Sequence, residues 1–270
     1  MPAYQLPKRR RIYLMRHGDV TYFDDSGRTI DPETVPLNAN GQEQASTAGR
    51  VFAEQQVRFD RVIVSGLPRT VETAQRVLAE TGQRIEVEIE PAWHEIRGGK
   101  LRQIPLQDLE AAFLGVFDGI VPESTRFLDG ETIGELFDRV LPAVAALRED
   151  SSWDTVLLVL HGGVNRAILS HALTAGGHTF FGHLAQATGC INALDVGTAP
   201  RDWVLRAIIP RRRRCIATSA IRRWKFSTHN SSNTRVAEPE PEETHGASVR
   251  KRRTGTAGGL LGVRGHAPRQ

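Results

Sequence analysis

Short apolar runs that stop abruptly at polar or glycine-rich turns constrain this chain more than any other feature. The most apolar run, Thr155–Leu160, has no charged residue and leads directly into His161-Gly162-Gly163. A run of this length and composition is typical of a strand buried on both faces of a sheet. Similar runs recur along the chain, with helix-like segments between them. This alternation predicts an α/β fold, a three-layer sandwich with a mostly parallel central sheet flanked by helices.

The expected elements are short strands and helices of ordinary length. We expect strands over residues 11–15, 60–64, 85–89, 155–160, 190–196 and 203–209. We expect helices over residues 41–55, 68–80, 106–117, 132–148 and 164–173. Pro68 suits the first turn of its helix, because a residue there needs no N–H partner within the helix. Residues 85–89 alternate apolar and acidic side chains, which indicates a strand with one face in water.

Arginine and histidine side chains follow three of the expected strands at the point where each strand ends. Arg16 and His17 follow the first strand, Arg69 follows the second across a short turn, and His161 follows the most apolar strand. In open sheets of this kind, ligands bind beyond the carboxyl ends of the strands. We therefore expect these four side chains to meet at one edge of the sheet.

Two guanidinium groups and two imidazoles in one place suit a phosphate. Arginine recognises phosphate oxygens through paired hydrogen bonds. A neutral imidazole can act as a nucleophile when its second nitrogen is held by a hydrogen bond. Charge spreads over the phosphoryl oxygens in the transition state, so fixed cations stabilise that state. The leaving alkoxide also needs a proton, which a nearby carboxylic acid can supply.

Six short motifs stand in order along the chain. They are Leu14-Met15-Arg16-His17-Gly18, Leu37-Asn38-Ala39-Asn40-Gly41-Gln42-Glu43-Gln44-Ala45, Ser65-Gly66-Leu67-Pro68-Arg69-Thr70 with Thr73-Ala74, His94-Glu95-Ile96, Gly130-Glu131-Thr132 and His161-Gly162-Gly163. In order and spacing they resemble the motifs of the histidine phosphatase superfamily, in its phosphoglycerate-mutase-like branch. The resemblance covers roughly residues 11–207. Arg-His-Gly alone would occur by chance, whereas six matches in order are specific.

The resemblance implies a role for each of the principal side chains. By this match His17 is the nucleophile and Glu95 is the general acid. Arg16, Arg69 and His161 bind the phosphate, and His161 also counts among the catalytic residues. The resemblance implies no metal and no cofactor.

Positions around this centre bear on the substrate contacts. On the resemblance, Asn38 and Gly162 are expected to contact the substrate, although the family usually has threonine where Asn38 stands. The family also often has an asparagine six residues after the nucleophile, where this chain has Phe23. These departures leave the phosphate chemistry intact and concern the rest of the substrate.

Three functions from two classes fit these residues. The first is a hydrolase of small phosphate monoesters that works through a phosphohistidine. The second is a cofactor-dependent phosphoglycerate mutase, which must keep water from its phosphohistidine under a closed lid. Residues 96–131 form a short, glycine-containing segment with little sign of a large lid, which favours the hydrolase. The third is a non-catalytic protein that binds a phospho-ligand or nucleic acid; such a protein would be expected to lack the nucleophile or the acid, and both are present.

Charge is distributed unevenly along the chain. The formal net charge is +4, yet residues 1–207 hold 21 Lys/Arg and 27 Asp/Glu, and residues 208–270 hold 14 basic and 4 acidic side chains. Residues 210–270 also lack apolar periodicity, which predicts a basic, disordered tail after a catalytic domain over residues 1–209. Such a tail can contact nucleic acid or an anionic membrane, or remain solvated. The abrupt change of composition after Ile209 would also result from translation in a shifted reading frame.

The expected partner of the folded part is a small phosphorylated substrate. We do not expect nucleic acid as its partner, because the basicity belongs to the tail. The apolar stretch over residues 12–15 is too short for a signal peptide, and no segment approaches the length of a membrane span. Two cysteines, Cys190 and Cys215, form no disulfide framework. These features predict a cytoplasmic protein without a membrane partner. They are also compatible with a homodimer.

Truncation after residue 209 tests the predicted boundary. We expect the truncated protein to keep its thermal unfolding midpoint and its catalytic rate, because the removed segment cannot bury a core. Thermal unfolding and phosphatase assays on the full-length and truncated chains measure both quantities. A large loss of either in the truncated protein would show that the tail is part of the folded domain.

Overall fold

The computed structural model describes residues 8–22, 24, 26, 28, 30–99 and 117–209. Phe23, the tail after residue 209 and nearly all of the helix expected over 106–117 lie outside these residues. The boundary at residue 209 therefore stays a prediction. No helix in the described ranges combines the length and apolar character that crossing a bilayer requires.

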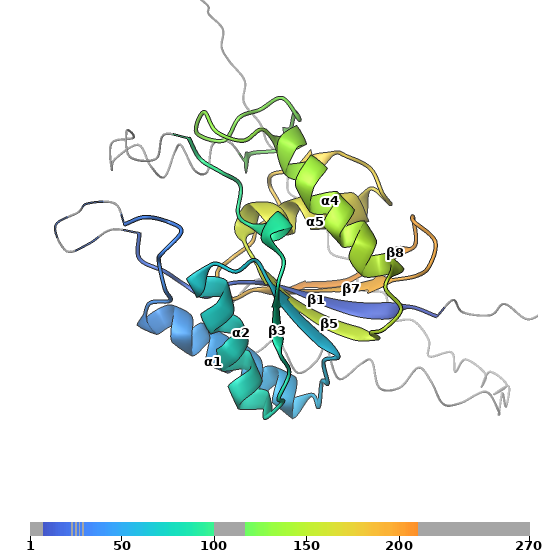
Figure 1. Ribbon diagram of the computed structural model, residues 1–270. Helices are drawn as coiled ribbons and strands as arrows, with labels where there is room; N and C mark the ends of the chain where they lie inside the picture. Colours follow the sequence, from blue (N-terminus) through green and yellow to red (C-terminus); the bar gives the residue numbers. More distant parts are fainter. Residues whose placement is uncertain are drawn as a thin grey trace, which may run out of the picture. The chain divides into compact units, whose positions relative to one another are not determined.

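A six-stranded sheet forms the centre of the fold, with the strand order β3-β2-β5-β1-β7-β8 (Figure 1). The strands are β1 Arg10–Arg16, β2 Arg61–Val64, β3 Val87–Ile89, β5 Thr155–Leu160, β7 Ile191–Val196 and β8 Trp203–Ile209. Strands β3, β2, β5 and β1 pair in parallel, whereas β7 runs antiparallel to both of its neighbours. The mostly parallel sheet predicted from the sequence is confirmed.

Within the residues that the structure describes, four helices cover the two faces of this sheet. They are α1 Ala39–Glu54, α2 Pro68–Thr81, α4 Ile133–Glu149 and α5 Gly162–Leu173. Helices α1 and α2 lie on one face and α4 and α5 on the other (Figure 1). The three-layer sandwich is therefore confirmed.

Strand β5 shows why the layers form. Its alternate side chains Val156, Leu158 and Leu160 pack with residues of α4 and α5, whereas Leu157 and Val159 pack with residues of α1 and α2. All five are at most 1% exposed. Successive side chains of a strand point to opposite faces, so an uninterrupted apolar run requires a helical layer on each side.

Local sequence signals account for the helix starts. Helix α1 begins after Asn38, whose side-chain oxygen accepts a hydrogen bond from Gly41 N at 2.8 Å. Pro68 occupies the first turn of α2 as expected. Before α4, Thr132 and Glu135 form a reciprocal capping box, in which each side chain accepts from the other residue's backbone N–H.

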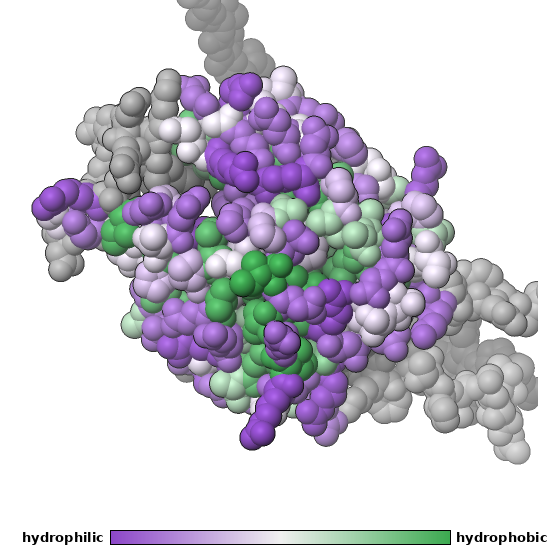
Figure 2. All heavy atoms as spheres, in the orientation of Figure 1, coloured by the Kyte–Doolittle hydropathy of each residue, from purple (hydrophilic) through white to green (hydrophobic). Residues whose placement is uncertain are grey.

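Several short elements were not expected from the sequence. A 3₁₀ turn, η1, covers Pro91–Trp93, and a separate two-stranded sheet pairs β4 (Ile120–Val121) with β6 (Phe180–Phe181). On the face shown in Figure 2, apolar side chains gather where Figure 1 draws the edge strand β3. Ile89 of this strand is 61% exposed, whereas the alternation predicted for residues 85–89 places the acidic side chains, and not the apolar ones, in water.

Candidate active site

The parallel pairing of β1 with β5 brings the two predicted histidines together. In this register Arg16 lies opposite Leu160, so the next residues, His17 and His161, emerge side by side. His17 N donates to the Leu160 carbonyl at 2.9 Å. The two imidazole rings meet edge to face, with their centroids 5.2 Å apart.

The His17 ring is held as a neutral tautomer. Its Nδ1 lies 2.6 Å from the Gly18 carbonyl oxygen, which can only accept, so Nδ1 carries the proton. Burial lowers the pKa of His17 well below its usual value, and the charges of Arg16 and Arg69 lower it further. At neutral pH the ring therefore keeps a lone pair on Nε2, the atom a nucleophile needs.

His161 is fully buried and is oriented by a hydroxyl. Its Nε2 lies 2.8 Å from Ser65 Oγ, and its Nδ1 has no hydrogen-bond partner among the described residues. Burial lowers the pKa of His161 well below its usual value, with smaller contributions from His17, Arg69 and Arg16. A buried ring nitrogen without a partner is costly unless a ligand satisfies it.

Arg16 and Arg69 supply positive charge without an ion-pair partner among the carboxylates of the described residues. Arg16 Nη1 donates to the Gln186 carbonyl, and Arg69 Nη1 donates to the Pro32 carbonyl. The Nε atoms of both arginines are buried and have no partner within the described part of the chain. Arg69 is only 2% exposed. Two guanidiniums held by neutral carbonyls leave a net positive charge beside His17, which favours an anion there.

Glu95 reaches the same edge from the segment that follows η1. Both of its carboxylate oxygens accept from Gly163 N, at 3.0 and 3.1 Å, and Oε1 also accepts from Ile96 N at 2.9 Å. Gly163 lies in the first turn of α5, whose free N–H groups attract anions. Helix α5 thus places the carboxyl group near His161, which precedes the helix.

Gly162 lies between two guanidinium groups. A Cβ atom at this position would stand 3.3 Å from Arg166 Nη1 and 3.5 Å from Arg16 Cζ. A Cβ atom would therefore be tight against Arg166 and in ordinary van der Waals contact with Arg16. The structure places Gly162 beside the cations, and its direct contact with substrate stays a prediction.

Asn38 takes part in holding a loop. Besides capping α1, its side-chain nitrogen donates to Asp19 Oδ2 and Thr21 Oγ1, each at 3.2 Å. These bonds fix the segment after Gly18 against α1. The substrate contact expected of Asn38 stays a prediction, and the observed contacts are structural.

Three further residues belong to this centre although the sequence reasoning gave them no role. Ser65 orients His161, as described above. Tyr22 lies within electrostatic reach of Arg69 and Glu95, and burial raises the pKa of its phenol, which stays neutral. Arg166 donates to the Gly182 and Gly162 carbonyls at 2.9 and 3.1 Å, and burial and Arg16 lower its pKa. The role of Arg166 could have been predicted from the sequence, because a residue four positions after Gly162 lies on the same face of the helix.

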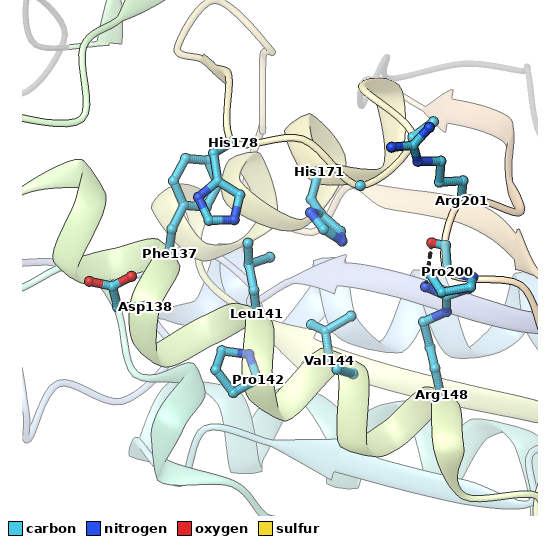
Figure 3. Close-up of a pocket in the computed structure, with 13 residues that line it drawn as sticks. Phe137, Asp138, Leu141, Pro142, Val144, Arg148, His171, His178, Pro200 and Arg201 are labelled. Carbon is cyan, nitrogen blue, oxygen red and sulfur yellow. Dashed lines mark hydrogen bonds between the residues drawn. The ribbon is translucent and has the colours of Figure 1, made fainter.

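A separate cavity lies away from these residues. It has a volume of about 460 Å³ and is bordered by α4, by α5 and its following loop, and by the turn before β8 (Figure 3). His171, His178, Arg148 and Arg201 are among its lining residues, and none of the predicted site residues is. Across the described ranges, no group of three or more His, Cys, Asp and Glu side chains is arranged to hold a metal ion.

Fold and site together define an α/β protein with an anion-binding centre built around a neutral histidine. Residues 12–208 match the histidine phosphatase superfamily (branch 1). The chain therefore belongs to that superfamily and is an enzyme of the histidine-phosphatase type.

Relatives in this superfamily carry mutase and phosphatase names. The chain is 26% identical over 173 residues to phosphoglycerate mutase-like protein 4 of Arabidopsis thaliana, covering 60% of this chain and 70% of the relative. It is 29% identical over 154 residues to the probable phosphoglycerate mutase GpmB of Salmonella paratyphi A, covering 56% and 69%.

Solved structures of phosphatases share the fold. A putative alpha-ribazole-5'-P phosphatase from Escherichia coli superposes with a TM-score of 0.59 at 25% identity, covering 75% of this chain and 97% of the other. A mycobacterial glucosyl-3-phosphoglycerate phosphatase superposes with a TM-score of 0.58 at 23% identity, covering 73% and 97%. The second likeness supports the fold alone.

The lowered histidine pKa values predict how stability depends on pH. In the unfolded chain His17 and His161 titrate near pH 6.5, so below that pH the unfolded state binds protons that the folded state does not. Stability is therefore complete above about pH 6.5 and falls as the pH drops towards the folded-state values. We expect each histidine to cost about 1 kcal/mol of unfolding free energy between about pH 6.5 and 5.5.

Urea unfolding of the wild type and of His161→Gln at both pH values measures this loss. The variant should lose about 1 kcal/mol less than the wild type over the same pH interval. His183→Gln is the matched control, because His183 is exposed and should leave the pH dependence unchanged. An unchanged pH dependence in His161→Gln would contradict the buried, neutral state of this ring.

Proposed function

We propose that the chain is a phosphomonoester hydrolase that acts on small phosphorylated metabolites through a phosphohistidine on His17. One observation carries the proposal: buried nitrogen atoms of Arg16, Arg69 and His161 lack hydrogen-bond partners among the described residues and surround a neutral imidazole. A phosphoryl group is the ligand that satisfies such donors and accepts attack from such a nitrogen.

The proposed first step is phosphoryl transfer to the enzyme. The Nε2 lone pair of His17 forms a bond to phosphorus while the ester P–O bond breaks. The electron pair of the broken bond goes to the leaving oxygen, which takes a proton from Glu95 and departs as an alcohol. Arg16 and Arg69 offset the negative charge on the phosphoryl oxygens throughout.

The second step returns the enzyme to its starting state. A water molecule gives a proton to the Glu95 carboxylate and attacks phosphorus, and the P–N bond breaks with its electron pair returning to His17 Nε2. Inorganic phosphate leaves. Glu95 keeps the proton that the water gave it and can protonate the leaving oxygen of the next substrate.

The names of the relatives support a mutase as the second candidate. In a phosphoglycerate mutase the same phosphohistidine would return its group to a substrate hydroxyl instead of to water. The short segment over residues 96–131 favours the hydrolase, although residues 100–116 lie outside the described ranges. A non-catalytic phospho-ligand or nucleic-acid binding protein is disfavoured because the nucleophile and the acid are both present.

Substitutions of His17 and Glu95 test the assigned roles. His17→Ala should abolish phosphate release from monoesters, because no other group replaces the nucleophile. Glu95→Gln should still bind phosphate but turn over alkyl phosphates about 10²- to 10⁴-fold more slowly, because it cannot donate a proton. Steady-state kinetics and phosphate titrations measure both effects, with His178→Gln as a control outside the centre. Full activity in purified His17→Ala protein would end this mechanism.

A product analysis separates the hydrolase from the mutase. Inorganic phosphate release from several monoesters is compared with the interconversion of 2- and 3-phosphoglycerate in the presence of the bisphosphate primer. We expect phosphate release to dominate, because the short, glycine-containing sequence over residues 96–131 shows little sign of a large lid that would keep water from a phosphohistidine. Fast interconversion with negligible phosphate release would make the mutase the correct function.

A further inference from the structure

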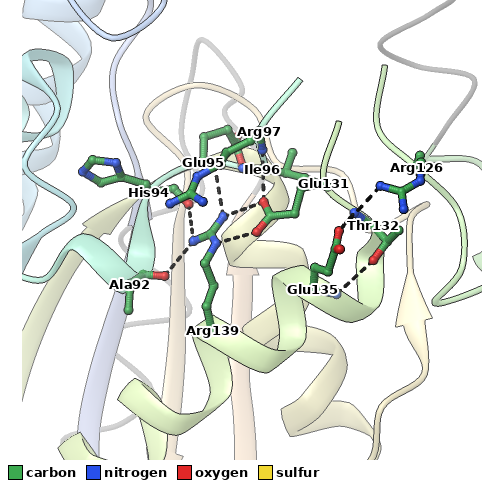
Figure 4. A network of polar contacts seen from close by, with 10 residues as sticks. All are labelled: Ala92, His94, Glu95, Ile96, Arg97, Arg126, Glu131, Thr132, Glu135 and Arg139. Atoms are coloured by element: carbon green, nitrogen blue, oxygen red, sulfur yellow. Dashed lines mark hydrogen bonds and ion pairs between the residues drawn. The ribbon is translucent and has the colours of Figure 1, made fainter. Parts of the chain in front are cut away.

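The backbone that carries Glu95 is held by one arginine of α4. Arg139 Nη1 donates to the Ala92 and His94 carbonyls at 2.7 and 2.8 Å, and Nη2 donates to the carbonyl of Glu95 itself at 3.1 Å (Figure 4). Three backbone carbonyls within four residues thus converge on a single guanidinium. Such a contact fixes the path of the chain on both sides of the carbonyl groups it binds.

The remaining donors of this guanidinium bind one carboxylate. Arg139 Nε donates to Glu131 Oε1 at 2.6 Å and Nη2 donates to Glu131 Oε2 at 2.8 Å, a bidentate pair. An arginine side chain has five N–H donors, and all five are used here. The pair is partly buried, with side-chain exposures of 17% for Arg139 and 7% for Glu131.

Glu131 also binds the far end of the same segment. Its Oε2 accepts from Arg97 N at 3.0 Å, and its own backbone N–H donates to the Arg97 carbonyl at 2.8 Å. Gly130 permits this approach, because a Cβ atom there would stand only 2.1 Å from the Arg97 carbonyl oxygen. Residues 92–97 are therefore tied at both ends and in the middle, with Glu95 between the ties.

We propose that Arg139 and Glu131 are positioning residues for the proton donor Glu95. The proposal rests on the proposed function, in which Glu95 protonates the leaving oxygen. On one side the Glu95 carboxylate binds Gly163 N of α5, and on the other its backbone is held by Arg139 of α4. The two contacts set where the carboxyl group stands relative to His17. A displacement of about 1 Å is enough to lose most of the benefit of a positioned catalytic group.

The choice of leaving group makes this role measurable. An alkyl phosphate such as glycerol 2-phosphate needs a proton on its leaving oxygen, whereas 4-nitrophenyl phosphate releases a stable phenolate and needs it far less. Arg139→Lys keeps the charge but offers three donors for five acceptor contacts. We expect kcat/KM for glycerol 2-phosphate to fall about 10- to 100-fold, with a much smaller loss on 4-nitrophenyl phosphate.

Glu131→Gln tests the same role from the other side of the pair and should give the same selective loss. Glu135→Gln is the matched control, because it removes a carboxylate from the first turn of the same helix without a contact to residues 92–97. It should change both substrates alike. Thermal unfolding identifies a temperature at which each variant is folded for the assays.

A double variant separates positioning from general stability. If Arg139 acts through Glu95, Arg139→Lys should cost little further activity on glycerol 2-phosphate in a Glu95→Gln background. Equal losses on both substrates, or a full additional loss in the double variant, would overturn the positioning role of Arg139 and leave the proposed function of the chain unaffected. If Glu95→Gln itself affects both substrates equally, Glu95 is not the proton donor, and the proposed mechanism fails together with this inference.

Discussion

The parallel pairing of β1 with β5 is the constraint on which the site depends. Its register sets His17 beside His161, and the pairing of β2 on the other side of β5 brings Ser65 and the start of α2 to the same edge. A slip of one residue would turn each of these side chains to the opposite face of the sheet. The apolar run of β5, buried by helices on both faces, is what holds this register.

The electrostatics of the centre follow from this convergence. Arg16 and Arg69 bring positive charge into a buried place, and neither forms an ion pair with a carboxylate of the described residues. Burial keeps both histidines neutral, which limits the total charge. Such an arrangement destabilises the free protein and favours any anion that fills it, so a bound phosphate should stabilise the fold by mass action. The charges of Arg16 and Arg69 thus favour a bound phosphoryl group and add to the lowering of the histidine pKa values that burial causes.

Much of this fold could be predicted from the sequence, because apolar runs and the regular spacing of apolar residues indicate which side chains must be buried. The six expected strands and four of the helices are present near their predicted bounds. The two-residue strands β4 and β6 carry too few residues for any period. The contacts of Arg139 with residues 92–97 were not readable either, because they join distant segments whose approach only the packed fold defines. Arg166 was overlooked although its spacing from Gly162 was informative.

The central claim is that a phosphoryl group passes through His17, and trapping the phosphoenzyme tests it most directly. The protein is mixed with a monoester substrate and quenched within milliseconds in alkali, in which a phosphohistidine survives, and its peptides are analysed by mass spectrometry. The account predicts one phosphoryl group, on His17. It should be absent when the monoester substrate is left out of the mixture, and it should disappear as the ester is consumed. Turnover without a phosphoenzyme, or a phosphoryl group on another residue, would contradict it.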